Sequence, residues 1–187
     1  DDIVIDSAFW FNRLYKALQA RKACNIIRPD NNTYRLVHGE GDQLPGLIID
    51  IYDHAAIIQA HSVGMHLYRK DIAQQLCELY NNELTCIYYK SETTLPYKAD
   101  LSEESGFLHG KASDVIATEN GLKFHIDWLK GQKTGFFIDQ RDNRHLIEKY
   151  SKGRKVLNMF CYTGGFSVYA MRGGAATVHS VDSSERA

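Results

Sequence analysis

The sequence predicts an α/β protein in which a small α+β domain is followed by a β-α-β unit. Near the end of the chain, Val156 to Asp182 has the pattern strand, glycine turn, helix, strand. Short runs of β-favouring residues, separated by turn residues, fill most of residues 27–129. A helical, amphipathic pattern covers most of residues 1–26. We therefore predict a linker helix at 1–26, an α+β central domain at 27–129 and the start of a second domain at 130–187.

The β-α-β unit is the most informative part of the sequence. Its predicted elements are a strand at 156–160, a turn at Thr163-Gly164-Gly165, a helix at 166–171 ended by Gly173-Gly174, and a strand at 177–181 followed by Asp182. A buried strand, a glycine turn, a helix and a second strand form the opening unit of a doubly wound, Rossmann-like nucleotide-binding fold.

This unit has the residue types that a nucleoside site needs. Two adjacent glycines let a ligand approach the backbone where a Cβ would clash. The helix behind them offers unpaired N–H groups and a partial positive charge. Asp182 lies 17 residues after Gly165, close to the roughly 20 expected for an acid that binds ribose hydroxyls. The alternative is an ordinary strand-turn-helix whose glycines only form the turn.

The pattern favours a nucleoside ligand without a pyrophosphate, because the dinucleotide fingerprint G-x-G-x-x-G is absent. S-adenosylmethionine is therefore the candidate cofactor, and an NAD-linked enzyme with the same glycine turn is a rival interpretation. The candidate cofactor-binding residues of this unit are Phe160, Tyr162, Thr163, Gly164, Gly165, Asp182 and Ser183.

Two further blocks carry a family resemblance. Residues 131–144 read GQKTGFFIDQRDNR, and residues 34–52 read YRLVHGEGDQLPGLIIDIY. Together with NMFCYTGGFS at residues 158–167, they resemble the Class I S-adenosylmethionine-dependent methyltransferases that modify 23S ribosomal RNA. The three blocks are most similar to the large subunit methyltransferase I group, which methylates cytosine at C5, and they stand in that family's order.

The resemblance implies an enzyme that transfers a methyl group from S-adenosylmethionine to a base of 23S rRNA. Cytosine C5 is the first choice for the target, and guanine N7 or another base is the alternative. The resemblance also implies that Gln140 and Arg141 lie in one wall of the cofactor pocket. Arg141 can bind the carboxylate of the methionine part through two parallel hydrogen bonds, or it can pair with Asp139 or Asp142 at the surface.

By the family's pattern, an RNA-binding PUA domain precedes the first helix, and the base-attacking cysteine and a D-P-P motif follow several strands later. The present sequence contains no D-P-P. Cys161 belongs to the cofactor loop and is a poor candidate for the nucleophile, so we assign no catalytic residue. We expect a fragment with weak cofactor binding and no methyl transfer, whose exposed strand edges are covered by the central domain or by another copy in a homodimer.

Composition supports a globular, cytoplasmic protein. Hydrophobic residues make up 44% and charged residues 24% of the chain, and no apolar run is long enough for a membrane span. The four cysteines have no C-x-x-C pair, which favours reduced thiols used in packing. The eight histidines are scattered without a ligand-like spacing, so we predict no metal site.

The charge distribution suggests where RNA would bind. Residues 1–129 contain 12 Lys and Arg against 18 Asp and Glu, whereas residues 130–155 contain 8 against 3. A basic stretch before the presumed cofactor site suits a phosphate backbone, although a solvated helix face explains one charge cluster equally well. A non-catalytic module that holds RNA or protein is the remaining interpretation of the central domain.

The other predicted elements follow from local patterns. Helices are expected at 8–23, 68–80 and 142–150, strands at 34–38, 47–52, 55–61 and 86–89, a surface loop at 95–105, and a hairpin of 114–119 and 122–127 around Asn120-Gly121. In the helix at 142–150, the periodicity predicts that Leu146, Ile147 and Tyr150 face a core.

Overall fold

The computed structural model describes residues 4–91, 94–95, 105–111 and 114–184. Its contacts divide the chain into two compact units, Asp1–Phe136 and Phe137–Ala187. The first unit ends at Phe136, seven residues after Leu129, where the sequence analysis ended the central domain.

The first unit is built on a mixed five-stranded sheet in the order β1-β2-β3-β4-β5. The strands are β1 (Thr33–His38), β2 (Leu47–Tyr52), β3 (Ala55–Ala60), β4 (Cys86–Tyr89) and β5 (Gly106–Gly110), and the helices are α1 (Ser7–Ala23), the 3₁₀ turn η1 (Gly39–Asp42), α2 (Val63–Leu67) and α3 (Arg69–Leu79). Strands β3 and β4 pair in parallel, and the other neighbours pair antiparallel. The α2–α3 segment connects the parallel pair, as a parallel connection requires.

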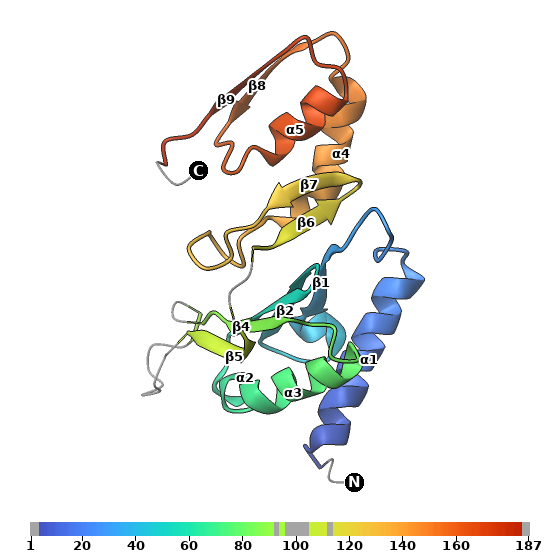
Figure 1. The fold of residues 1–187 in the computed structure, drawn as a ribbon, viewed down its shortest axis with the longest axis vertical. Coiled ribbons are helices and arrows are strands. Elements are labelled where there is room, and N and C mark those ends of the chain that lie inside the picture. Colours follow the sequence, from blue (N-terminus) through green and yellow to red (C-terminus); the bar gives the residue numbers. More distant parts are fainter. Residues whose placement is uncertain (1–3, 92–93, 96–104, 112–113, 185–187) are drawn as a thin grey trace. The chain divides into compact units, whose positions relative to one another are not determined.

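Side-chain alternation decides which face of this sheet is covered by helices. In β2, Ile49 and Ile51 are buried in the main hydrophobic core together with Leu14 of α1 and Ile72 of α3. Helices α1 and α3 pack against each other and lie along this face (Figure 1). The side chain of Asp6 caps α1 by accepting the Phe9 N–H at 2.8 Å.

The opposite face of the sheet holds a buried polar network. Asp50 is fully buried and accepts two hydrogen bonds from Arg35, at 2.8 and 3.0 Å. It also accepts the hydroxyl of Thr134 at 2.6 Å, and that hydroxyl lies 2.8 Å from the Tyr52 hydroxyl. Lys90 directly follows β4, and its Nζ donates to the carbonyl groups of Trp128 and Gly131. The GQKTG segment is therefore attached to the sheet near both of its ends.

The Asn120-Gly121 turn forms the hairpin that the sequence predicted. Strands β6 (Ile116–Glu119) and β7 (Leu122–His125) pair antiparallel. The turn residues have φ of 49° and 76°, the left-handed backbone that a type I′ turn needs at both positions. Asn32 holds the hairpin on the sheet by accepting the Thr118 N–H at 2.6 Å through its side chain.

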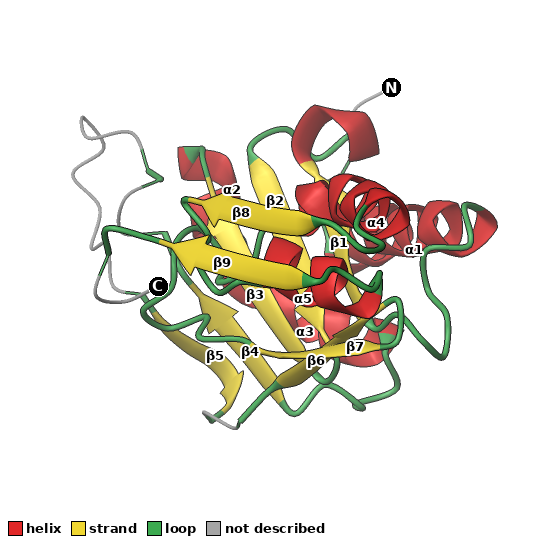
Figure 2. Cartoon of the chain, turned by 90° about the horizontal axis from the view of Figure 1, so that it is seen from above, coloured by secondary structure: helices red, strands yellow, loops and turns green. Residues whose placement is uncertain are grey.

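The second unit contains one β-α-β crossover and a preceding helix. Its elements are the 3₁₀ turn η2 (Ile138–Gln140), α4 (Arg141–Tyr150), β8 (Lys155–Met159), α5 (Gly165–Arg172) and β9 (Thr177–Val181). Strands β8 and β9 pair in parallel, with Val156 opposite Val178, and Figure 2 shows them side by side with the same direction. Helices α4 and α5 pack against each other. The predicted α/β class and Rossmann-like β-α-β unit are confirmed.

One α-helix and one β-strand escaped the sequence analysis. Helix α2 is only five residues long, too short to show a helical period. Strand β5 begins and ends with glycine, which weakens a strand pattern. At its end, Gly110 has φ of 65° and a Cβ there would lie 1.9 Å from the carbonyl oxygen of Thr85, so glycine is required. Most of the loop predicted at 95–105 lies outside the described residues.

The prediction that Leu146, Ile147 and Tyr150 face a core is wrong. These side chains are 46%, 36% and 67% exposed, and the buried residue of α4 is Arg144 instead. The hydrophobic period locates the apolar face of a helix, but it does not show whether a neighbouring element covers that face. In the described part of the chain, α4 packs on α5 through a different face.

The cysteines differ in accessibility, which gives a test of the first unit's core. Cys86 is fully buried, and burial raises the pKa of its thiol to about 11, whereas Cys24 is exposed. Because only a thiolate reacts with disulfide reagents, Cys24 should be labelled in the native chain at pH 8 and Cys86 should stay unmodified. Peptide mapping after labelling in buffer and in urea measures both. Rapid native labelling of Cys86 would contradict the packing of β4.

Candidate cofactor site

The turn between β8 and α5 has an unusual backbone. Phe160, Tyr162 and Gly164 have φ of 57°, 47° and 76°, the left-handed region that non-glycine residues rarely adopt. Gly164 is the N-cap of α5, and no side chain caps this helix. Its first N–H groups therefore depend on another partner. The turn combines a strained backbone with an uncapped helix start, which are common features of ligand sites.

Asp182 holds this turn from the end of β9. Its Oδ2 accepts the N–H of Tyr162 at 2.8 Å, and its Oδ1 accepts the N–H of Ser184 at 2.9 Å. These hydrogen bonds, with a further one from the Ser183 backbone, lower the pKa of the carboxyl group below its usual value. An ionised carboxylate has about four acceptor positions, so Asp182 can bind the turn and still accept ligand hydroxyls.

A polar ladder fixes α5 on the two strands. Asn158 of β8 donates to the Ser167 hydroxyl at 2.9 Å, and this hydroxyl lies 2.7 Å from the hydroxyl of Ser180 in β9. Ser167 is buried. The ladder therefore sets the position of the first turn of α5 relative to both strand ends. The sequence analysis missed these residues. A signal was available for Asn158, because it lies two residues after Val156 and so on the same, helix-facing side of β8.

The Gln140–Arg141 segment forms the start of α4. Gln140 is half-buried; its amide donates to Asp139 at 3.1 Å and accepts from Asn143 at 3.0 Å. Arg141 is the first residue of α4 and is half-buried. Just before η2, the ring of Phe137 meets that of Tyr162 edge to face at 5.4 Å. The two sequence blocks that predicted a cofactor site thus come into contact within the second unit.

The predicted residues divide into two groups by their surroundings. Tyr162, Gly164, Gly165 and Asp182 are brought together by the turn and its hydrogen bonds. Phe160 is 82% exposed, and Thr163 and Ser183 are also exposed, so they form the outer rim. Cys161 is half-buried, with its Sγ 3.6 Å from the Tyr162 carbonyl oxygen.

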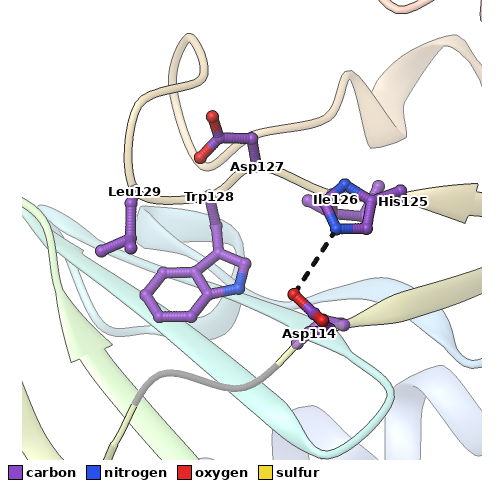
Figure 3. Close-up of a pocket in the computed structure, with 7 residues that line it drawn as sticks. Asp114, His125, Ile126, Asp127, Trp128 and Leu129 are labelled. Carbon is purple, nitrogen blue, oxygen red and sulfur yellow. Dashed lines mark ion pairs between the residues drawn. The ribbon is translucent and has the colours of Figure 1, made fainter.

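A separate cavity of about 490 Å³ lies in the first unit. It is lined by Asp114, Val115, His125, Ile126, Asp127, Trp128 and Leu129 (Figure 3). His125 Nε2 lies 3.8 Å from Asp114 Oδ1, and both side chains are largely exposed. The Trp128 ring packs against Tyr88 and is buried. None of the predicted cofactor-binding residues lines this cavity.

Within the described ranges, no group of three or more His, Cys, Asp or Glu side chains is placed to hold a metal ion. The helices of the same ranges include none that is both long and apolar enough to cross a membrane.

Comparison with known families finds a similarity in the second half of the chain. Residues 94–186 match the profile of the S-adenosylmethionine-dependent methyltransferase family. This match agrees with the β-α-β unit and its glycine turn.

Individual relatives are more specific. The chain is 43% identical, over its whole length, to the ribosomal RNA large subunit methyltransferase I of Tolumonas auensis, of which it covers 47%. It superimposes over its whole length on 47% of a Streptococcus mutans protein described as a SAM-dependent methyltransferase, with a TM-score of 0.84 and 26% identity. A structure with the same score and coverage is described as a methyltransferase complexed with SAH. The chain spans about half the length of the curated relatives it matches.

Proposed function

We propose that the second unit binds S-adenosylmethionine and that the whole protein transfers the methyl group to a base of 23S rRNA, with cytosine C5 as the target. The observation that carries the proposal is the Asp182 carboxylate, which accepts the N–H groups of Tyr162 and Ser184 beside a glycine turn and a helix start without a side-chain cap. This arrangement offers hydroxyl acceptors next to open backbone, as a nucleoside requires. The family match of residues 94–186 supports the same cofactor.

Each predicted residue has a role in this proposal. Asp182 accepts the ribose hydroxyls, while Gly164 and Gly165 let the cofactor lie against the start of α5. Tyr162 and Phe160 provide apolar surface at the turn. Other contacts come from Thr163, Ser183 and Gln140, and Arg141 binds the carboxylate of the methionine part.

The RNA substrate is inferred from the relatives, which are named as ribosomal RNA large subunit methyltransferases I. Guanine N7 or another base remains the alternative target. Lys149, Lys152, Arg154 and Lys155 are exposed and offer a basic surface for phosphates. Arg144 belongs to the same basic stretch of residues 130–155, but it is buried and so is not part of this surface. We place this activity in the cytoplasm.

A second candidate function is a module that holds RNA or protein without chemistry, and a third is an NAD-linked enzyme.

A homodimer is part of the proposal, because Leu157 and Met159 on the outer face of β8 are 64% and 50% exposed. Apolar side chains of this kind suit an interface.

Calorimetry separates these functions. We expect the chain to bind S-adenosylhomocysteine and not NAD. Binding of NAD would favour the NAD-linked enzyme, and binding of neither compound would favour the module that holds RNA or protein without chemistry.

Replacing Asp182 with Ala should weaken the binding of S-adenosylhomocysteine by roughly 10- to 100-fold, because the ribose hydroxyls lose their acceptor. The matched control is Asp142→Ala, which removes an exposed carboxylate from the same unit. Unchanged affinity in Asp182→Ala would remove Asp182 from the site.

The basic surface has its own test. Replacing Lys152 and Lys155 with Ala should flatten the salt dependence of RNA binding, with the slope falling by about 0.7–0.9 per lost phosphate contact. The control replaces Lys16 and Lys22, which are exposed on α1 and carry the same charge. Filter binding of a 23S rRNA fragment at several salt concentrations gives the slopes. Equal slopes for the chain and the Lys152/Lys155 variant would assign these lysines to a solvated surface.

For the 187-residue chain alone we expect no methyl transfer. We assign no base-attacking cysteine to this chain, and its sequence contains no D-P-P motif. Covalent attack on C6 of the base requires such a thiolate. Radiolabelled S-adenosylmethionine and unmodified 23S rRNA provide the assay. Turnover above a blank without enzyme would show that other residues of this chain carry the chemistry.

A further inference from the structure

Arg144 is a buried charged side chain of the second unit, with only 2% of its surface exposed. Its Nη1 donates to the carbonyl oxygen of Phe137 at 3.0 Å. Its guanidinium carbon lies 6.0 Å from the centre of the Phe166 ring, within the range in which a cation is attracted to an aromatic face. Arg144 therefore joins three segments: its own helix α4, the residue before η2, and the first turn of α5.

Phe137 and Phe166, which Arg144 contacts, are both next to candidate cofactor-binding residues. The ring of Phe137 packs edge to face on Tyr162, and the N–H of Tyr162 donates to Asp182. Phe166 directly follows Gly165 at the start of α5. A displacement of Phe137 or Phe166 is thus transmitted to the glycine turn and to the carboxylate at the end of β9.

We propose that Arg144 is a positioning residue of the cofactor site, which holds the turn at Tyr162 and the start of α5 in their binding geometry. The inference rests on the proposed cofactor function. A planar guanidinium can donate to a carbonyl group and lie near a ring at the same time, which the point charge of lysine does less well. Side chains that support a site in this way hold its binding residues close to the geometry that the ligand needs. Binding weakens when such side chains are lost.

Two substitutions and a matched control test this role. Arg144→Met keeps a long apolar side chain and removes the donors, and Arg144→Lys keeps the charge. The control is Arg172→Met. Arg172 of α5 also joins the two helices, through two 2.7 Å hydrogen bonds to Glu148 of α4. Its guanidinium carbon lies 4.9 Å from the ring centre of Tyr169 in its own helix. The control therefore removes a guanidinium that also joins α4 and α5, but that is exposed and lies at the opposite end of α5.

Three measurements are made on each full chain: urea unfolding, an NMR titration with S-adenosylhomocysteine, and hydrogen exchange of the Tyr162 amide relative to the amides of the β8–β9 ladder. Arg144→Met should raise the dissociation constant and the relative exchange rate of the Tyr162 amide, each by about tenfold. Arg144→Lys should recover part of both changes. Arg172→Met should lower the free energy of unfolding. It should change the dissociation constant and the relative exchange rate of the Tyr162 amide by less than about twofold each.

The outcomes separate this inference from the proposed function. Parental affinity and parental Tyr162 exchange in Arg144→Met would overturn the positioning role. Equal changes in Arg172→Met would overturn it too, because the effect would then follow general stability. If the parental chain does not bind S-adenosylhomocysteine, the proposed cofactor is wrong, and no cofactor site remains for Arg144 to position. The Tyr162 exchange then shows whether Arg144 holds the turn at all.

Discussion

The hydrogen bond between the Tyr162 N–H and Asp182 is the interaction on which the second unit depends most. The chain must leave β8 and enter α5 within a few residues, and it does so with left-handed backbone at Phe160, Tyr162 and Gly164. Such a conformation costs about 1–2 kcal/mol at a non-glycine residue, so it persists only where surrounding contacts hold it. Asp182 supplies one of these contacts, and the same carboxylate remains able to accept ligand hydroxyls.

The first unit uses a buried acid in a comparable way. Asp50 satisfies two donors of Arg35 and the hydroxyl of Thr134, so the segment after the β6–β7 hairpin is attached to the sheet face opposite the helices. Removing one member of such a network leaves a buried polar group without its partner, which costs more than the network's net contribution to stability. Gly135 completes this attachment, because a Cβ there would lie 2.8 Å from the Trp128 backbone.

Much of the fold could be predicted from local patterns. The β2, β4 and β9 bounds agree with the expected ones, because strands bounded by turn residues have sharp limits. The Asn120-Gly121 turn is specified by two neighbouring residues alone. Elements without such signals were missed, namely the five-residue α2 and the glycine-bounded β5. The predicted face of α4 failed for a different reason, because periodicity contains no information about which neighbour is present.

The sequence by itself determined the order of elements, the β-α-β unit and the identity of Asp182 as the acid after its second strand. These features depend on residue spacing and turn chemistry, which are local. Only the tertiary structure showed that Arg144, one of the eight basic residues of 130–155, is buried and contacts Phe137 and Phe166. Only the structure also showed that Asn158, Ser167 and Ser180 meet. Contacts between residues distant in the chain depend on how helices and strands pack, and one sequence does not specify that packing residue by residue.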